Sequence, residues 1–287
     1  MKEKPLGTAG AVITLLLLFT GIFADLLAPY GMNEQIWVDK LVAPSAGHWL
    51  GTDHLGRDIL SRVIYGARVS VIVGFAATTL STINSVILGM LSGYIGGKFD
   101  LIVQRFVDAW MALPGLILLM VIMSFIGPGI MTVIIALGVL GGFTGSRVIR
   151  GATMAIKENV YIEASKAVGN STARTLFRHI LPNIMAPIII SFSTRIPGVI
   201  LTEASLSFLG FGIPPPIPSW GGMLSGRGRE FMFLAPWMVI WPGLALSIVV
   251  YGVNMLGDAV RDLLDPKLRG GVERYGVSAT KEPTIKR

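Results

Sequence analysis

Long apolar stretches alternate with short polar segments along the whole chain. Each apolar stretch approaches or exceeds the roughly 20 residues that an α-helix needs to cross a bilayer. No Asp, Glu, Lys or Arg lies between Arg68 and Lys98, or between Glu230 and Asp258. We predict six membrane-spanning helices, at residues of about 9–27, 69–94, 106–126, 130–146, 184–206 and 233–256. The pattern therefore predicts an all-α integral membrane protein.

The longest uncharged stretch, residues 109–146, is too long for a single span. As one helix it would extend for roughly 57 Å, whereas the hydrocarbon core of a bilayer is about 30 Å thick. It also contains Gly127-Pro128-Gly129, which does not continue a helix comfortably. We interpret the stretch as two spans joined by a tight turn.

Three segments outside the predicted spans are long enough to have structure. They are an outer segment at about 28–68, an inner loop at about 147–183, and the linker "GFGIPPPIPSWGGMLSGRGREF". The four prolines of the linker exclude a regular helix and indicate a fixed, extended cap. The predicted parts are an N-terminal helix with the outer segment at 1–68, a five-helix core at 69–265, and a polar, disordered tail at 266–287.

Composition and charge support the membrane assignment and give it a direction. The chain is 52% hydrophobic and 14% charged, against about 25% charged residues in soluble domains. With the N-terminus in the cytoplasm, most Lys and Arg residues lie on the cytoplasmic side, as the positive-inside rule requires. The first apolar stretch lacks a clear small-x-small cleavage site, so we expect a retained helix.

Motifs for metal-dependent or nucleotide-dependent catalysis are absent from the sequence. Neither H-E-x-x-H nor G-x-S-x-G occurs. His48, Asp53 and His54 can in principle ligate a divalent ion, but we interpret both histidines as surface loop residues and expect no metal. "GGKF" at 96–99 lacks the glycine and hydroxyl of a phosphate loop. We therefore expect no catalytic residues, no cofactor and no ATP site in this chain.

The inner loop contains the polar stretch "EASKAVGNSTARTLFRHILPN". We predict a helix over Val160–Val168, ended by Gly169 in a left-handed conformation. Asn170 or Ser171 then caps a second helix over Thr172–Ile180, which Leu181-Pro182 ends or kinks. The expected apolar side of the first helix consists of Ile162, Ala164, Ala167 and Val168.

This arrangement is a helix–turn–helix, yet membrane spans lie within a few residues of both its ends. We therefore reject DNA binding and expect docking into a groove of a cytoplasmic protein.

Two charged residues, Arg195 and Glu203, lie inside the predicted fifth span. They are separated by about 12 Å along a helix axis, so they cannot pair directly on one straight helix. Charge at membrane depth indicates a transport pathway. Structural pairing with another span or with a partner chain is the equally supported alternative. A proton-coupled carrier also stays open, although such carriers usually have repeats and more intramembrane charge.

The inner loop resembles the "EAA" loop of ABC-transporter permeases of the type I importer class. The matching positions are Glu163-Ala164-Ser165, Gly169 and Ile180-Leu181-Pro182, with Ser165 in place of the second alanine. Further stretches resemble the second permease subunit of dipeptide, oligopeptide and nickel importers. They are "HWLGTDHLGRDILSRVIYGARVS", "GYIGGKFD", "DAWMALPG", "LTEASLSFLGFGIPPPIPSWGGML" and "GDAVRDLLDPKLR".

The resemblance implies a six-span type I permease core whose cytoplasmic loop transmits ATP-driven closure. The implied coupling residues are Glu163, Ala164, Ser165, Gly169, Arg178, Leu181 and Pro182. The implied partners are a homologous permease, two ATPase subunits, an extracytoplasmic substrate-binding protein and membrane lipid, without nucleic acid. The implied location is a prokaryotic inner membrane, with both termini cytoplasmic.

The function that follows is the import of di- or oligopeptides. Within the same family, nickel and oligosaccharides are alternative substrates. From a different class, a stand-alone channel or proton-coupled carrier is the alternative function.

Overall fold

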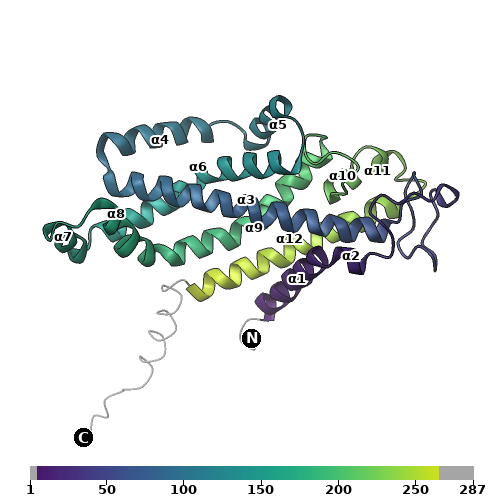
Figure 1. The fold of residues 1–287 in the computed structure, drawn as a ribbon, viewed down its shortest axis with the longest axis horizontal. Helices are drawn as coiled ribbons and strands as arrows, with labels where there is room; N and C mark the ends of the chain where they lie inside the picture. The colour runs from purple at the N-terminus through teal and green to yellow at the C-terminus, as the bar shows by residue number, and fades with distance from the viewer. Residues whose placement is uncertain (1–4, 265–287) are drawn as a thin grey trace, which may run out of the picture.

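The computed structural model describes residues 5–264, and the predicted tail at 266–287 lies outside this range. The described chain consists of helices and their connections (Figure 1). The α-helices are α1 (Pro5–Ile22), α2 (Ala24–Leu27), α3 (Ile59–Ile95), α4 (Gly97–Met111), α5 (Gly115–Ile126), α6 (Ile130–Lys157), α7 (Val160–Ala167), α8 (Thr172–Thr175), α9 (Met185–Phe208), α10 (Trp220–Leu224), α11 (Arg227–Glu230) and α12 (Trp237–Leu264). Three short turns complete them: the 3-10 helix η1 (Trp37–Asp39), the π-helix η2 (Leu176–Ile180) and the 3-10 helix η3 (Leu181–Ile184).

Within residues 5–264, five helices are long and apolar enough to cross a membrane. They are α1, α3, α6, the continuous run Thr172–Phe208 that contains α9, and α12. The pair α4–α5 would make a sixth span, but its two helices meet at 89°. The predicted all-α membrane fold is therefore confirmed.

The predicted continuous span at 106–126 is wrong, because the chain bends sharply at Ala112–Pro114. Met111 ends α4 and Gly115 begins α5. Proline disfavours the helical conformation of the residue before it and has no N–H to donate to the preceding turn. As Figure 1 shows, α4 lies alongside the bundle, and α5, at a steep angle to α4, packs Leu119 and Met123 into the core with residues of α6 and α9. An ion pair holds α4 in place, with Arg150 Nε of α6 2.6 Å from Asp100 Oδ1.

The second and fourth spans both extend beyond their predicted limits. The helix α3 begins at Ile59, ten residues before the predicted start of its span, because Asp58 caps it by accepting a hydrogen bond from Ser61 N at 2.8 Å. The helix α6 continues to Lys157 rather than ending at 146. The inner loop is therefore shorter than predicted and begins only after Lys157.

Close contact between α3 and α6 forms the centre of the bundle. A Cβ atom on Gly89 would lie 2.5 Å from Ser146 O, and one on Gly93 would lie 2.8 Å from Arg150 O. Small residues allow two membrane helices to approach to backbone contact, where van der Waals packing stabilises the pair. On the other side of the bundle, α1 packs along α12 in the same way, with Gly10 against Gly252 O.

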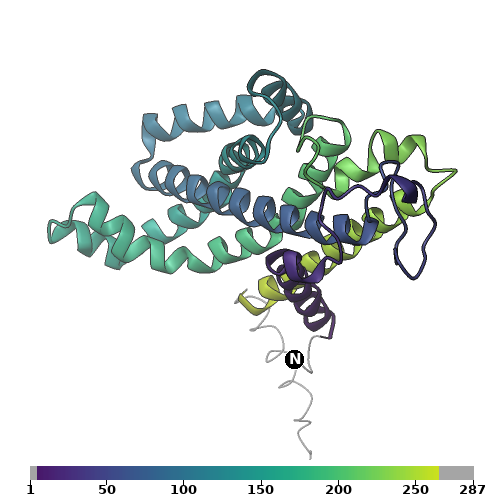
Figure 2. The same cartoon turned by 45° about the vertical axis from the view of Figure 1, so that its right-hand side comes forward.

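The two polar regions lie at opposite ends of the bundle (Figures 1 and 2). The outer segment between α2 and α3 lies at one end, beside α10 and α11. The helices α7 and α8 project from the other end, toward which α1 begins and α12 ends. Residues 209–219, which contain the prolines, form no helix, but the predicted helix-free linker is wrong beyond them, because it includes α10, capped by Ser219, and α11.

Candidate functional site

The segment from α7 to η3 is a compact projection at one end of the bundle. Gly169 has φ +83°, and its N–H donates to Lys166 O at 2.9 Å. Ser171 caps α8 by accepting a hydrogen bond from Arg174 N at 3.3 Å. The predicted break at Gly169 and the cap at Ser171 are both present. Asn170, the other candidate for this cap, instead closes the turn, because its Nδ2 donates to Ser165 Oγ at 3.0 Å.

Of the two outcomes that we predicted at Leu181-Pro182, an end or a kink of the second helix, the structure excludes an end. The chain passes from α8 through the π-helix η2 and the 3-10 helix η3 directly into α9. The wider π turn lets Leu181 N bond to Leu176 O. The chain can then continue past Pro182, whose ring and missing N–H would interrupt a regular α-helix. The projection is therefore continuous with a membrane-spanning helix.

One face of the projection is buried against the bundle. Ile162 of α7 is fully buried, in an apolar cluster that also contains Met90 and Ile149 of α3 and α6. Ser165 follows it on the same face. The predicted apolar side is otherwise wrong, because Ala164, Ala167 and Val168 are exposed. Residues three apart lie on the same face of a helix. Contact with the bundle decides that the buried face of α7 is the one with Ile162 and Ser165.

The opposite face of the projection is exposed and presents both charged and apolar side chains. Of the predicted coupling residues, Glu163, Ala164, Gly169, Arg178 and Pro182 are exposed, Ser165 is buried and Leu181 is half-buried. Three large apolar residues are also exposed: Val160 at 79%, Val168 at 83% and Phe177 at 69%. Exposed apolar side chains beside charged ones are compatible with a docking surface.

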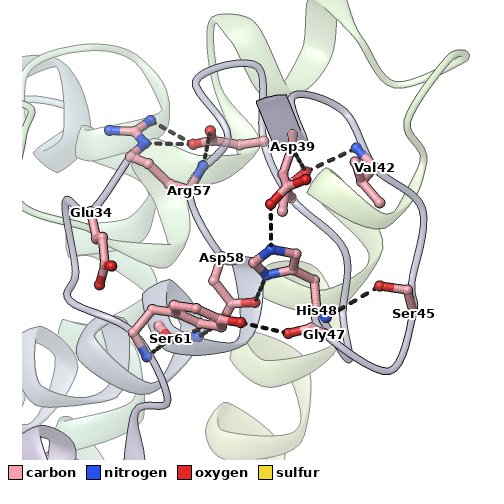
Figure 3. A network of polar contacts seen from close by, with 12 residues as sticks. Glu34, Asp39, Val42, Ser45, Gly47, His48, Arg57, Asp58 and Ser61 are labelled. Carbon is pink, nitrogen blue, oxygen red and sulfur yellow. Dashed lines mark hydrogen bonds and ion pairs between the residues drawn. The ribbon is translucent and has the colours of Figure 1, made fainter. Parts of the chain in front are cut away.

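The outer segment is organised by a buried polar network (Figure 3). His48 Nδ1 lies 2.9 Å from Asp58 Oδ1, and His48 Nε2 lies 3.5 Å from Asp39 Oδ2. His48 is only 5% exposed, so its interpretation as a surface residue is wrong. Asp53 Oδ2 instead accepts a hydrogen bond from Arg57 Nε at 2.7 Å. Among residues 5–264, no group of three or more His, Cys, Asp or Glu can hold a metal ion.

His54 is separate from this network and packs beside Phe231, with ring centroids 6.0 Å apart. Burial lowers the pKa of His54. The side chain lines a cavity of about 430 Å³ between the outer segment and the residues around α10. The three residues considered for a metal therefore have three different environments.

Asp58 is the residue on which the outer segment depends most. One of its oxygens contacts His48, and the other accepts from both Ser61 N and Ser61 Oγ at 2.8 Å. We expect Asp58→Ala to destabilise this segment by about 2–3 kcal/mol, since it removes a helix cap and leaves buried donors unpaired. Limited proteolysis of the purified protein should then cleave within residues 28–58 more quickly.

Asp25→Ala is the matched control, because Asp25 forms an exposed ion pair with Arg68. Such pairs contribute little to stability, so cleavage should hardly change. Equal cleavage rates in the two variants would contradict the assignment of Asp58 as the central residue.

Arg195 and Glu203 have different surroundings, although both lie on α9. Arg195 Nη1 donates to Ser81 Oγ of α3 and to Gly141 O of α6. Glu203 is 1% exposed and accepts a hydrogen bond from Ser207 Oγ at 2.7 Å. Ser207 Oγ in turn accepts from Ile213 N at 3.0 Å, so Glu203 helps to attach the proline-containing linker. The two charges do not contact each other.

Arg195 lines an open cavity of about 850 Å³ bordered by α5, α6, α9 and the bend between α4 and α5. The α9 residues that line it are Ser191, Thr194, Arg195, Gly198, Val199, Leu201, Thr202 and Ser205. Glu203 is not part of this lining. Only Arg195 of the two intramembrane charges is therefore placed at an open cavity.

Residues 85–270 match the family described as binding-protein-dependent transport system inner membrane component. The chain belongs to this family. The inner membrane component is 39% identical to the dipeptide transport system permease protein DppC of Alkalihalophilus pseudofirmus, over 94% of this chain and 88% of that protein.

Two further relatives are similar over almost the same length. The chain is 38% identical to the oligopeptide transport system permease protein OppC of Bacillus subtilis, over 93% of this chain and 88% of the relative. It is 39% identical to the glutathione transport system permease protein GsiD of Pectobacterium atrosepticum, over 93% of this chain and 89% of the relative.

A solved structure shares the fold of this inner membrane component. A chain of the inward-facing MetNI methionine ABC transporter superposes with a TM-score of 0.57, covering 71% of this chain and 96% of that chain. Its sequence identity is 16%, so the likeness concerns the fold alone.

The sequence did not reveal the polar stripe of α9 in this inner membrane component. Ser191, Thr194, Gly198, Thr202 and Ser205 recur at three- and four-residue intervals, which places them on one helix face. The periodicity was available in the sequence. Isolated hydroxyl residues are common in membrane helices, however, and only the cavity shows which face is open.

Proposed function

We propose that this chain is one of two permease subunits of an ATP-driven importer of di- and oligopeptides. The observation that carries the proposal is 38–39% identity to DppC, OppC and GsiD over more than nine-tenths of the chain. Their names refer to a dipeptide, an oligopeptide and glutathione, and glutathione is itself a small peptide. A peptide is the substrate class that the three have in common.

In this proposal, the projection formed by α7, Gly169 and α8 docks on a cytoplasmic ATPase subunit. The implied coupling residues Glu163, Ala164, Gly169 and Arg178 are on its exposed surface, beside exposed apolar side chains. Since α8 continues through η2 and η3 into α9, displacement of the projection is transmitted to a helix that lines the membrane cavity. ATP binding can shift the inward/outward equilibrium only through a difference in its interaction with the two states, and this connection is a route by which that difference reaches the pathway.

The remaining subunits follow from the same proposal. Two ATPase subunits supply the energy, a homologous permease completes the pathway, and an extracytoplasmic binding protein delivers the peptide. We place the projection and both termini in the cytoplasm, and the outer segment on the opposite side. The arrangement of α1, α12 and the projection toward one end of the bundle supports this orientation, as does the clustering of Lys and Arg in the inner loop.

Reconstitution of the complete transporter in proteoliposomes tests the function. We expect uptake of di- or oligopeptides that requires ATP, both ATPase subunits and the binding protein. Uptake by this chain without any ATPase would instead indicate a stand-alone carrier or channel. ATP-dependent uptake of a different solute, with none of a peptide, would overturn the substrate class.

Glu163→Lys should weaken docking of the ATPase subunits. Glu163 is exposed on α7, and reversal of its charge changes the electrostatic complementarity of an interface at that position. The amount of ATPase that co-purifies with the membrane subunits should fall. Glu34→Lys, an equal charge reversal at an exposed site in the outer segment, is the matched control. Unchanged co-purification in both variants would argue against docking at Glu163.

A further inference from the structure

The cavity between α5, α6 and α9 has one polar wall and two largely apolar walls. Leu116 and Leu119 of α5 and Leu137 and Leu140 of α6 form part of the apolar lining. The polar wall is the stripe of α9 that contains Arg195. Thr194 and Gly198 of this stripe are exposed, Thr202 and Ser205 are half-buried, and all four line the cavity. The hydroxyls of Thr194, Thr202 and Ser205 donate to backbone oxygens of their own helix, and their oxygens can still accept hydrogen bonds from an occupant of the cavity.

Arg195 lies near the middle of its membrane-spanning helix. It is ten positions after Met185, the first residue of α9, or about 15 Å along the helix axis. An arginine at this depth requires a counter-charge or strong hydrogen bonds. Within residues 5–264, however, Arg195 forms no ion pair, and Glu203 is directed to Ser207 instead.

The hydrogen bonds of Arg195 fix the guanidinium but leave part of it free. Nη1 has two protons, and it donates to Ser81 Oγ and Gly141 O. The protons on Nε and Nη2 have no acceptor in the described part of the chain. Nε and Nη2 form one edge of the guanidinium fork, which can donate two parallel hydrogen bonds to one carboxylate. The side chain is therefore held in place, and the hydrogen-bonding capacity of its Nε–Nη2 edge is unused within residues 5–264.

Two glycines of α6 make the space for this guanidinium. A Cβ atom on Gly141 would lie 2.8 Å from Arg195 Nη1, and a Cβ atom on Gly145 would lie 2.6 Å from Nη2. Any larger residue at either position would displace the guanidinium. The surrounding helices thus provide a fitted location for a positive charge that they do not neutralise.

We propose that Arg195, together with the hydroxyl stripe of α9, is a carboxylate-binding site for the peptide in the translocation pathway. This inference rests on the proposed function. Every linear peptide has a C-terminal carboxylate whatever its sequence, so one fixed guanidinium can serve peptides of many sequences. One ion pair without further charges also binds weakly enough to release its ligand, as conduction through a pathway requires.

A single-cysteine reporter tests the charge of the site in the assembled transporter. The chain has no cysteine, and a Cβ on Gly198, one helical turn from Arg195, meets no other atom within 4 Å. Gly198→Cys can be labelled with an anionic sulfonatoethyl or a cationic trimethylammonium methanethiosulfonate, and the labelling of this chain measured by mass spectrometry. We expect the anionic-to-cationic rate ratio to fall about tenfold when Arg195→Gln is added. Arg195→Lys should preserve the ratio.

An unchanged ratio in Arg195→Gln would overturn the proposal. It would mean that another subunit, for example through a carboxylate of the partner permease, neutralises the guanidinium in the complex. Occupation of the cavity by lipid would prevent labelling of Gly198→Cys by both reagents, and that result would overturn the proposal as well.

Transport of a matched peptide pair tests the ligand. The pair consists of the same peptide as a free acid and as a C-terminal amide, each supplied on saturated binding protein. In Arg195→Gln, uptake of the acid should fall about tenfold, while uptake of the amide should change by less than about twofold. An equal fall for both peptides would indicate a structural role for Arg195 and would overturn the proposal.

The two experiments separate this proposal from the proposed function. If the transporter takes up peptide but Arg195→Gln leaves the reagent ratio unchanged, the proposed carboxylate site is wrong and the proposed function stands. If the reagent ratio depends on Arg195 but the transporter takes up no peptide, the proposed function is wrong, and a peptide is not the ligand of the site.

Discussion

Replacing Gly169 with valine should leave ATP hydrolysis active while peptide uptake falls by about tenfold or more. Gly169 has φ +83°, a conformation that a β-branched residue adopts only at a cost of about 1–3 kcal/mol. The chain can relieve this strain by changing the angle between α7 and α8. Closure of the ATPase subunits would then no longer displace α9 in the correct direction. Parallel measurements of ATP hydrolysis and uptake in proteoliposomes check the prediction.

Two matched variants isolate backbone conformation as the cause. Asparagine tolerates a left-handed conformation, so Gly169→Asn should retain most of the coupling. Gly151 is an exposed helical glycine of α6, and a Cβ there, as at Gly169, meets no atom within 4 Å. Gly151→Val should therefore have little effect on uptake. If Gly169→Val shows normal uptake and normal substrate-stimulated ATP hydrolysis, the conformation of this turn is not needed for coupling.

Local features of the projection could be predicted from the sequence because they depend on adjacent residues. A glycine that follows a run of helix formers is sufficient to predict the break at Gly169. A serine just before the next helical run is sufficient to predict the cap at Ser171. Hydrophobicity alone likewise located five of the six predicted membrane spans, since each must satisfy its backbone hydrogen bonds internally within the bilayer.

Features that depend on contacts between distant residues could not be predicted. The burial of Ile162 rather than Ala164 is decided by the apolar cluster with α3 and α6. Similarly, His48 looks like a loop residue until Asp39 and Asp58 are brought to it from other parts of the outer segment.

The structure also separates two intramembrane charges that the sequence treats alike. Glu203 has a partner on its own helix, in Ser207, and is buried away from the cavity lining. Arg195 has two oxygen acceptors, on α3 and α6, and faces the cavity. Sequence spacing excludes a direct pair but does not show which charge is satisfied within the chain. That distinction is what makes Arg195 the better candidate for contact with a substrate.

Gly89→Leu should prevent the bundle from assembling as described. The Cβ alone would lie 2.5 Å from Ser146 O and 2.7 Å from Ile149 Cβ, and these belong to a helix whose position is fixed along its length. In a bilayer, no hydrophobic effect between helices compensates for a lost contact, because lipid is as apolar as leucine. Overpacking costs about 1–3 kcal/mol even in cores that can adjust, and the backbone of α6 cannot withdraw as a side chain can.

We expect a lower yield of monodisperse protein in detergent and a lower temperature of thermal unfolding for Gly89→Leu. Gly151→Leu adds the same side chain to an exposed site on α6, where the Cβ meets no atom within 4 Å, so it should behave like the original protein. The comparison distinguishes a steric effect at the α3–α6 contact from a general effect of leucine on expression. Equal stability of the two variants would mean that α3 and α6 do not approach to backbone contact at Gly89. The cavity beside α6 and the position of Arg195 depend on that same approach, because Ser81 of α3 and Gly141 of α6 hold the guanidinium from the two helices.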